Sequence, residues 1–122
     1  MGRTILVVED FDDVRDAMRI LLELRGYAVV EATDGLKAIE LAVEHLPDLI
    51  LMDLSMPVMD GIEATLAIRA NDTTHGIPIL AVTSYSQNYR DRATAAGCDE
   101  IFTKAEFMGN VGPILERHMV AA

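Results

Sequence analysis

The chain has 122 residues, a formal net charge of −10 at pH 7 and a single cysteine, Cys98. A chain of this length typically forms one domain that buries roughly two-thirds of its unfolded surface, and the lone cysteine excludes both a disulfide framework and a thiolate zinc site. The acidic balance argues against nucleic acid as a direct ligand, and the absence of a signal peptide or a membrane-spanning apolar run leads us to expect a cytoplasmic protein.

Five short apolar or β-branched runs, each ending at polar residues, are typical of strands. They cover residues 4–8, 27–31, 49–53, 78–83 and 100–103. Apolar residues recur at helical spacing after each of these runs. The five helices that we expect lie between Asp12 and Gly26, between a cap at Thr33 or Asp34 and Pro47, and over 61–70, 86–96 and 106–119.

Some of these elements are less well specified than others. The Asp34-Gly35 pair could also form a hairpin turn, although the helical spacing after it favours a helix. The apolar stripe of the second helix predicts that Leu46 is buried, and that of the third helix predicts burial of Leu66 or a neighbouring residue. The fourth helix is rich in alanine, and two glycines and Pro113 weaken the first half of the fifth helix.

The regular alternation of strand and helix predicts an α/β fold, in which helices cover both faces of a doubly wound parallel sheet. With strand order 2-1-3-4-5, the first and third strands are neighbours at the topological switch point, and ligands bind at the carboxyl ends of the strands. Polar residues stand at four of these ends, namely Glu9-Asp10, Asp53, Thr83-Ser84 and Lys104. We therefore expect three carboxylates, a hydroxyl and an ammonium in one shallow cleft.

This combination of groups suits phosphoryl transfer. Neighbouring carboxylates repel one another unless a cation offsets their charge, and oxygen ligands favour Mg²⁺. One Mg²⁺ together with Lys104 would balance the three negative charges. Asp53 would then act as the nucleophile, while Lys104 and Thr83 would stabilise the transferring oxygens. Each residue also has a purely structural explanation, as a helix cap, a strand residue or a surface lysine, but all of them fall at the carboxyl ends of strands.

Four segments of the chain carry a resemblance to a known family. They are Val-Val-Glu-Asp at 7–10, Met-Asp-Leu-Ser-Met-Pro-Val-Met-Asp-Gly at 52–61, Val-Thr-Ser at 82–84 and Thr-Lys at 103–104. In this order, and over essentially the whole chain, they resemble the receiver domain of bacterial two-component response regulators. The resemblance implies the flavodoxin-like fold of the chemotaxis response regulator, with five helices and with residues 1–122 forming one receiver domain.

The resemblance also implies roles for individual residues. A sensor histidine kinase or a histidine phosphotransfer protein would phosphorylate Asp53, with the help of Thr83 and Lys104. The magnesium ligands that it implies are Asp10, Asp53 and the backbone carbonyl of Ser55, with Glu9 acting largely through water. Ser55 and Tyr85 fall at the two variable positions that tune dephosphorylation in the family.

The resemblance implies that the phosphoryl group serves signalling by protein–protein contact, rather than turnover of a separate substrate. We expect output through helix four, strand five and helix five, toward a downstream protein or a second copy of the chain. We expect no direct contact with nucleic acid or membrane.

Two residues depart from the family pattern. The family usually has a proline with a cis peptide bond after the lysine, whereas this chain has Ala105. A cis bond before alanine costs about 3–4 kcal/mol, so we expect a trans bond and a rearranged loop that keeps Lys104 in the cleft. The family often has Tyr or Phe three residues before the lysine, whereas this chain has Ile101, and we expect the adjacent Phe102 on the opposite face. An aromatic switch is therefore not implied for this chain.

Three alternative functions are less consistent with the sequence. A haloacid-dehalogenase-type phosphatase needs a second aspartate two residues after the nucleophile, where this chain has Ser55. A flavin carrier needs a Gly-, Ser- or Thr-rich phosphate loop after the first strand, where the acidic segment 9–13 would repel phosphate. A degenerate receiver that serves only as an interaction module would not need the complete set of acidic residues, threonine and lysine.

Overall fold

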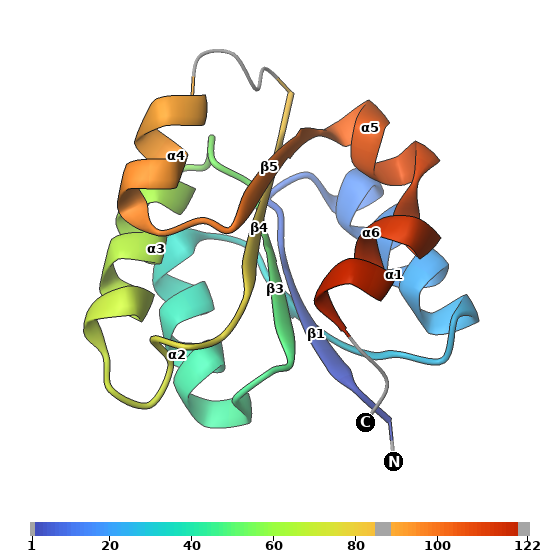
Figure 1. The fold of residues 1–122 in the computed structure, drawn as a ribbon, viewed down its shortest axis with the longest axis horizontal. Coiled ribbons are helices and arrows are strands. Elements are labelled where there is room, and N and C mark those ends of the chain that lie inside the picture. Colours follow the sequence, from blue (N-terminus) through green and yellow to red (C-terminus); the bar gives the residue numbers. More distant parts are fainter. Residues whose placement is uncertain (1, 85–88, 120–122) are drawn as a thin grey trace.

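The sheet contains five parallel strands in the order β2-β1-β3-β4-β5, as the sequence predicts (Figure 1). The structure, a computed structural model, describes residues 2–84 and 89–119. The strands are β1 (Thr4–Val8), β2 (Ala28–Ala32), β3 (Leu49–Met52), β4 (Ile79–Thr83) and β5 (Glu100–Thr103). The three central strands are almost completely buried, because helices cover both faces of a parallel sheet.

Six helices are found in the described part of the chain. They are α1 (Asp12–Leu24), α2 (Gly35–His45), α3 (Gly61–Ala70), α4 (Arg90–Ala96), α5 (Lys104–Gly109) and α6 (Val111–His118). α2, α3 and α4 cover one face of the sheet, and α1, α5 and α6 cover the other (Figure 1). An apolar cluster lies on each side, one around Ile50 and Ile68 and the other around Leu51 and Phe107. No helix in this part of the chain is long and apolar enough to cross a bilayer.

The pairing of β1 with β3 decides where the acidic residues emerge. The register pairs Val8 with Met52, so the next residues along, Glu9 and Asp53, leave the two strands at the same edge. Backbone hydrogen bonds extend the pairing by one residue on each side of β1. Asp53 N donates to Val8 O at 3.0 Å, and Glu9 N donates to Ala32 O at 3.0 Å. Both carboxylates therefore project from backbone that sheet hydrogen bonds hold in place.

The predicted helix over 106–119 is wrong, because two helices replace it. The Thr103 hydroxyl accepts from Glu106 N at 3.0 Å and the Glu106 carboxylate accepts from Thr103 N at 2.7 Å, so α5 begins directly after this capping box. The backbone of Asn110, with φ −138°, separates α5 from α6. Pro113 has no N–H for an intrahelical bond, and the break places it in the first turn of α6, where no intrahelical acceptor exists.

Leu46, a predicted core residue, is instead 55% exposed, and Leu66, predicted to be buried itself or through a neighbour, is 52% exposed. Leu46 is the C-cap of α2 and has a left-handed φ of 45°, which takes it off the helical stripe. On α3 the smaller Thr65 is fully buried at the position where Leu66 was expected. The hairpin alternative is wrong, because Asp34 caps α2 by accepting from Lys37 N at 2.9 Å.

The segment from α4 to β5 agrees with the sequence except at Tyr89, which was predicted to be helical but is the N-cap residue before α4. α4 begins at Arg90 and Gly97 follows its last residue with φ 113°, whereas residues 85–88 lie outside the described chain. Ile101 belongs to the apolar cluster under α2, α3 and α4, while Phe102 packs against the cluster on the opposite side of the sheet. The predicted opposite orientation of these two neighbours is therefore confirmed.

The loop after β3 contains one strained residue, Val58. Its φ is +68°, and Met59 N donates to Pro57 O at 2.7 Å across it, so Val58 is the central residue of a γ-turn with positive φ, a rare and strained type. A β-branched side chain fits this region of backbone conformation poorly. Because Val58 is 80% exposed, burial of its side chain offsets little of the strain.

Replacing Val58 with asparagine is expected to raise the free energy of unfolding by about 1 kcal/mol, because asparagine tolerates positive φ. Urea unfolding measures this change. The matched control is Val43→Asn, since Val43 is an exposed valine on the regular helix α2 and the same exchange there relieves no backbone strain. A gain of the same size in both variants would contradict the backbone explanation.

Candidate functional site

Asp53 lies directly after β3, and only 4% of its surface is exposed. Ser55 N donates to Asp53 Oδ1 at 3.3 Å, and the loop returns through a hydrogen bond from Gly61 N to Leu54 O at 3.2 Å. A β-carbon at Gly61 would overlap the carbonyl oxygen of Asp53, so glycine is needed for the start of α3 to approach this closely. The backbone around Asp53 is therefore held from both sides.

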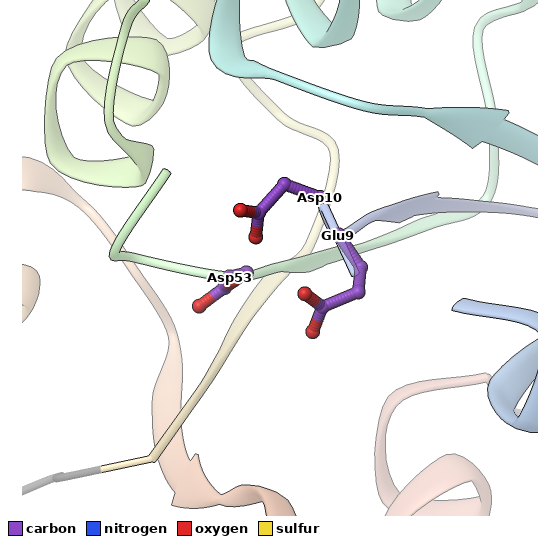
Figure 2. A group of neighbouring side chains, drawn as sticks. All are labelled: Glu9, Asp10 and Asp53. Atoms are coloured by element: carbon purple, nitrogen blue, oxygen red, sulfur yellow. The ribbon is translucent and has the colours of Figure 1, made fainter. Parts of the chain in front are cut away.

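Glu9, Asp10 and Asp53 form a group of three carboxylates, which we call the acidic group (Figure 2). One oxygen atom from each residue lies within 4.8 Å of the others. Figure 2 shows Glu9 and Asp10 projecting from the end of β1 toward Asp53 at the end of β3. Glu9 is buried and Asp10 is half-buried. The structure thus brings together the three carboxylates that the sequence predicts to converge.

Lys104 is the cation beside the acidic group. Its Nζ lies 2.8 Å from Glu9 Oε1 and 3.8 Å from Asp53 Oδ2, and 5.6 Å from the centroid of the Phe11 ring. The described chain contains no cis peptide bond. The Lys104–Ala105 bond is therefore trans, as predicted. Lys104 is the first residue of α5, and its side chain extends to the acidic group.

Burial is the main reason why the pKa of Asp53 rises from an ordinary value of 3.8 to about 7. Repulsion by Glu9 adds to this rise, whereas Lys104 and the Ser55 N–H act in the opposite direction because they favour the carboxylate. With one lysine against three carboxylates, the group has an excess of negative charge when all three are ionised.

The acidic group has the composition of a site for a hard divalent cation. Among the described residues, no hydrogen-bond partner reaches the buried Oδ1 of Asp10, and an unsatisfied buried carboxylate oxygen is costly. Glu9 Oε1 has its ion pair with Lys104 but no directed hydrogen bond within the same part of the chain. Oxygen-only ligands and excess negative charge fit Mg²⁺ better than a softer metal.

Asp53 borders a cleft of about 180 Å³. The residues that line it are Phe11, Asp53, Ser55, Thr83, Ser84, Tyr89 and Lys104. Two predicted site residues, Ser55 and Thr83, therefore border the same space as Asp53, and Thr83 is itself buried. Tyr85, which was expected to influence dephosphorylation, lies outside the described residues.

Sequence reasoning did not single out two of the lining residues, Phe11 and Tyr89. Phe11 is 64% exposed and contacts the Lys104 ammonium through its ring. Its position directly after Glu9-Asp10 is the signal that could have identified it. Tyr89 precedes α4, and no spacing in the sequence connects it with the ends of the strands.

Comparison with known sequences gives a match over most of the chain. Residues 5–111 match the family described as the response regulator receiver domain. The polar-differentiation response regulator DivK of Brucella anthropi is 35% identical to this chain over 105 residues, which make up 85% of each chain.

Solved structures show the same fold. The receiver domain of the sensor histidine kinase PA1611 from Pseudomonas aeruginosa, crystallised with a magnesium ion in its active-site cleft, is 33% identical with a TM-score of 0.91, covering 99% of this chain and 100% of that one. A chain of the Saccharomyces cerevisiae co-crystal structure of the histidine phosphotransfer protein Ypd1 with the receiver domain of its downstream response regulator Ssk1 is 26% identical. Its TM-score is 0.86, covering 96% of this chain and 88% of that chain.

Proposed function

The chain belongs to the response regulator receiver domain family of two-component signalling, and from this premise we propose that Asp53 accepts a phosphoryl group from a histidine kinase or a histidine phosphotransfer protein. The observation that carries the proposal is the position of Asp53, which is buried at the end of β3 beside the other two carboxylates and within 3.8 Å of the Lys104 ammonium. The relative crystallised with a phosphotransfer protein supports this class of donor.

The proposed step is a displacement at phosphorus. An ionised oxygen of Asp53 attacks the phosphorus atom of a phosphohistidine, the P–O bond forms as the P–N bond breaks, and the bonding electrons and then a proton go to the leaving imidazole nitrogen. Lys104 and Thr83 line the same cleft, and their ammonium and hydroxyl groups would donate hydrogen bonds to the phosphoryl oxygens as charge develops on them.

We also propose that the acidic group holds Mg²⁺, through Asp10, Asp53 and the backbone carbonyl of Ser55, with Glu9 acting largely through water. The ion would supply positive charge next to the phosphoryl oxygens. The chemistry of the donor set and the unpartnered Oδ1 of Asp10 support this assignment, as does the magnesium in the Pseudomonas aeruginosa relative.

For output, we propose contact with a downstream protein, or with a second copy of the chain, through α4, β5 and the α5–α6 segment. In this proposal the chain relays a signal in the cytoplasm and does not turn over a separate substrate. The net charge of −10 supports a protein partner over nucleic acid.

Incubation with acetyl phosphate and Mg²⁺ tests the proposed chemistry. Intact-protein mass spectrometry is expected to show one added phosphoryl group per chain. Removal of Mg²⁺ by EDTA should prevent the modification, because the negative charge of the acidic group would then repel the phosphodonor. No modification in the presence of Mg²⁺ would contradict the proposed function.

Replacing Asp10 with asparagine is expected to weaken Mg²⁺ binding at least about tenfold, because even groups that only orient a ligand contribute this much. Isothermal titration calorimetry measures the dissociation constant. The matched control is Asp13→Asn, since Asp13 is exposed and lines a neighbouring depression with Lys104 but is outside the acidic group. Equal weakening by both substitutions would show a general effect of charge and would contradict the assignment of Asp10 as a ligand.

A further inference from the structure

Arg15 on α1 is a second cation close to the acidic group. Only 12% of its side chain is exposed, and each of its three guanidinium nitrogens has its own acceptor. Nη1 donates to Glu9 O at 3.0 Å, Nε donates to Glu31 Oε2 at 3.0 Å and Nη2 donates to Asp12 Oδ1 at 2.6 Å. Arg15 thus connects the end of β1 with β2 and with the first turn of α1.

The contact with Glu9 differs from the other two because it is made to the backbone. Glu9 N is held by Ala32 O at 3.0 Å, and Glu9 Oε2 accepts from Phe11 N at 3.1 Å. The hydrogen bond from Arg15 adds the third constraint, on the carbonyl group. That carbonyl belongs to the peptide bond that leads into Asp10, so Arg15 holds the plane from which the Asp10 carboxylate projects.

We propose that Arg15 is a positioning residue for Mg²⁺ binding, which holds the Glu9–Asp10 peptide so that the Asp10 carboxylate is presented to the ion. This inference rests on the proposed function, because it requires that the acidic group binds Mg²⁺. Groups outside the ligand sphere that orient metal ligands typically change metal affinity by about 10–100-fold when they are removed.

Positioning and simple electrostatics predict effects of opposite sign. Arg15 carries a positive charge near a site for a cation, so removal of that charge alone would tighten Mg²⁺ binding. Loss of the contact with the Glu9 carbonyl would weaken it, because the Asp10 carboxylate would no longer be held in one orientation. The direction of the change in the dissociation constant therefore distinguishes the two effects.

The experiment is a calorimetric Mg²⁺ titration of wild type, Arg15→Met, Arg15→Lys and Arg19→Met at constant ionic strength. Arg19 is the matched control because it lies on the same helix and contacts the same Glu31 at 2.9 Å, but has no hydrogen bond to Glu9 within the described structure. We expect the dissociation constant to rise about tenfold in Arg15→Met. It should also rise in Arg15→Lys, which keeps the charge but loses the fork of donors, and stay unchanged or fall in Arg19→Met.

Phosphorylation by acetyl phosphate gives a second readout that a general loss of stability would not reproduce. The Mg²⁺ concentration for half-maximal rate should rise with the dissociation constant, while the rate at saturating Mg²⁺ stays close to that of wild type. Thermal unfolding without metal shows whether each variant is folded. If Arg15→Met does not fold, the comparison of Arg15→Lys with wild type tests the proposal.

Two results would overturn the inference and leave the proposed function intact. One is unchanged or tighter Mg²⁺ binding in the folded Arg15 variants. The other is a weakening in Arg19→Met as large as that in Arg15→Met. Failure of the wild-type protein to bind Mg²⁺ would instead contradict the proposed function, and the inference with it.

Discussion

Asp53→Asn is expected to lose phosphorylation by acetyl phosphate, with the initial rate falling at least about 1000-fold, as is typical when a nucleophile is removed. The amide has no anionic oxygen to attack phosphorus, and the acidic group loses one of its three carboxylates. The measurement is the rate of appearance of the phosphorylated species by intact-protein mass spectrometry at saturating Mg²⁺.

The control for this experiment is Asp72→Asn, since Asp72 is an exposed aspartate in the loop after α3. It should be phosphorylated at the wild-type rate. Labelling of Asp53→Asn at the wild-type rate would mean that another residue accepts the phosphoryl group. The assignment of the nucleophile would then be wrong even though the family assignment stands.

The acidic group could be predicted from the sequence because it depends on strand register. A buried strand of four or five residues leaves little freedom in where it ends, and the residue after each strand emerges at the same edge of the sheet. Glu9 and Asp53 follow β1 and β3 directly, so their convergence required only the strand order. The same reasoning placed Thr83 and Lys104 at this edge.

The residues that sequence reasoning missed contribute to the site through side-chain contacts, and not because they stand at the end of a strand. Phe11 and Arg15 belong to the loop and first turn after β1, and their roles depend on side-chain direction and on partners such as Glu31, which lies 16 residues away. Neither hydrophobic period nor strand order contains this information. Arg15 lies three and seven residues before the buried Met18 and Leu22 of α1, but its hydrogen bond to the Glu9 carbonyl is visible only in three dimensions.

Local backbone conformation was the other feature that could not be predicted from the sequence. The division of the last helical segment at Asn110 follows from Pro113 and from the cap at Thr103, and the sequence signals for these were present but pointed to a weak helix rather than to two. Val58 gives no signal at all for its positive φ, because valine is among the residues least suited to it. Such a position can be explained only by the turn that the surrounding loop requires.

Without divalent cations, Asp53→Asn is expected to make the fold more stable above neutral pH. The ionised carboxylate is unfavourable in the folded protein, since burial and repulsion by Glu9 raise the pKa of Asp53 from 3.8 to about 7. A tenfold change in proton affinity corresponds to about 1.4 kcal/mol. The resulting gain in the free energy of unfolding is on the order of 4 kcal/mol, and asparagine removes the charge at nearly constant shape.

The pH dependence of this gain follows from proton linkage. Between about pH 4 and pH 7 the folded protein keeps a proton on Asp53 that the unfolded chain has released, so the contribution of Asp53 to stability falls as pH rises through this window. Below the window the carboxyl group is neutral in both states, and above it the group is charged in both states. The stability gap between Asp53→Asn and wild type should therefore be small near pH 4, grow up to about pH 7 and then level off.

Urea unfolding in EDTA at about pH 4.5, 6 and 8 measures this gap. The control Asp72→Asn keeps Asp53, so its stability should follow that of wild type at each pH. Added Mg²⁺ should narrow the gap at pH 8, because an ion that binds only the folded wild type stabilises it by about 2.7 kcal/mol at 100 times its dissociation constant. A gap that is absent at pH 8, or that has the same size at every pH, would contradict the prediction. It would mean that Lys104, 3.8 Å from Asp53 Oδ2, offsets the negative charge of the acidic group without help from a metal ion.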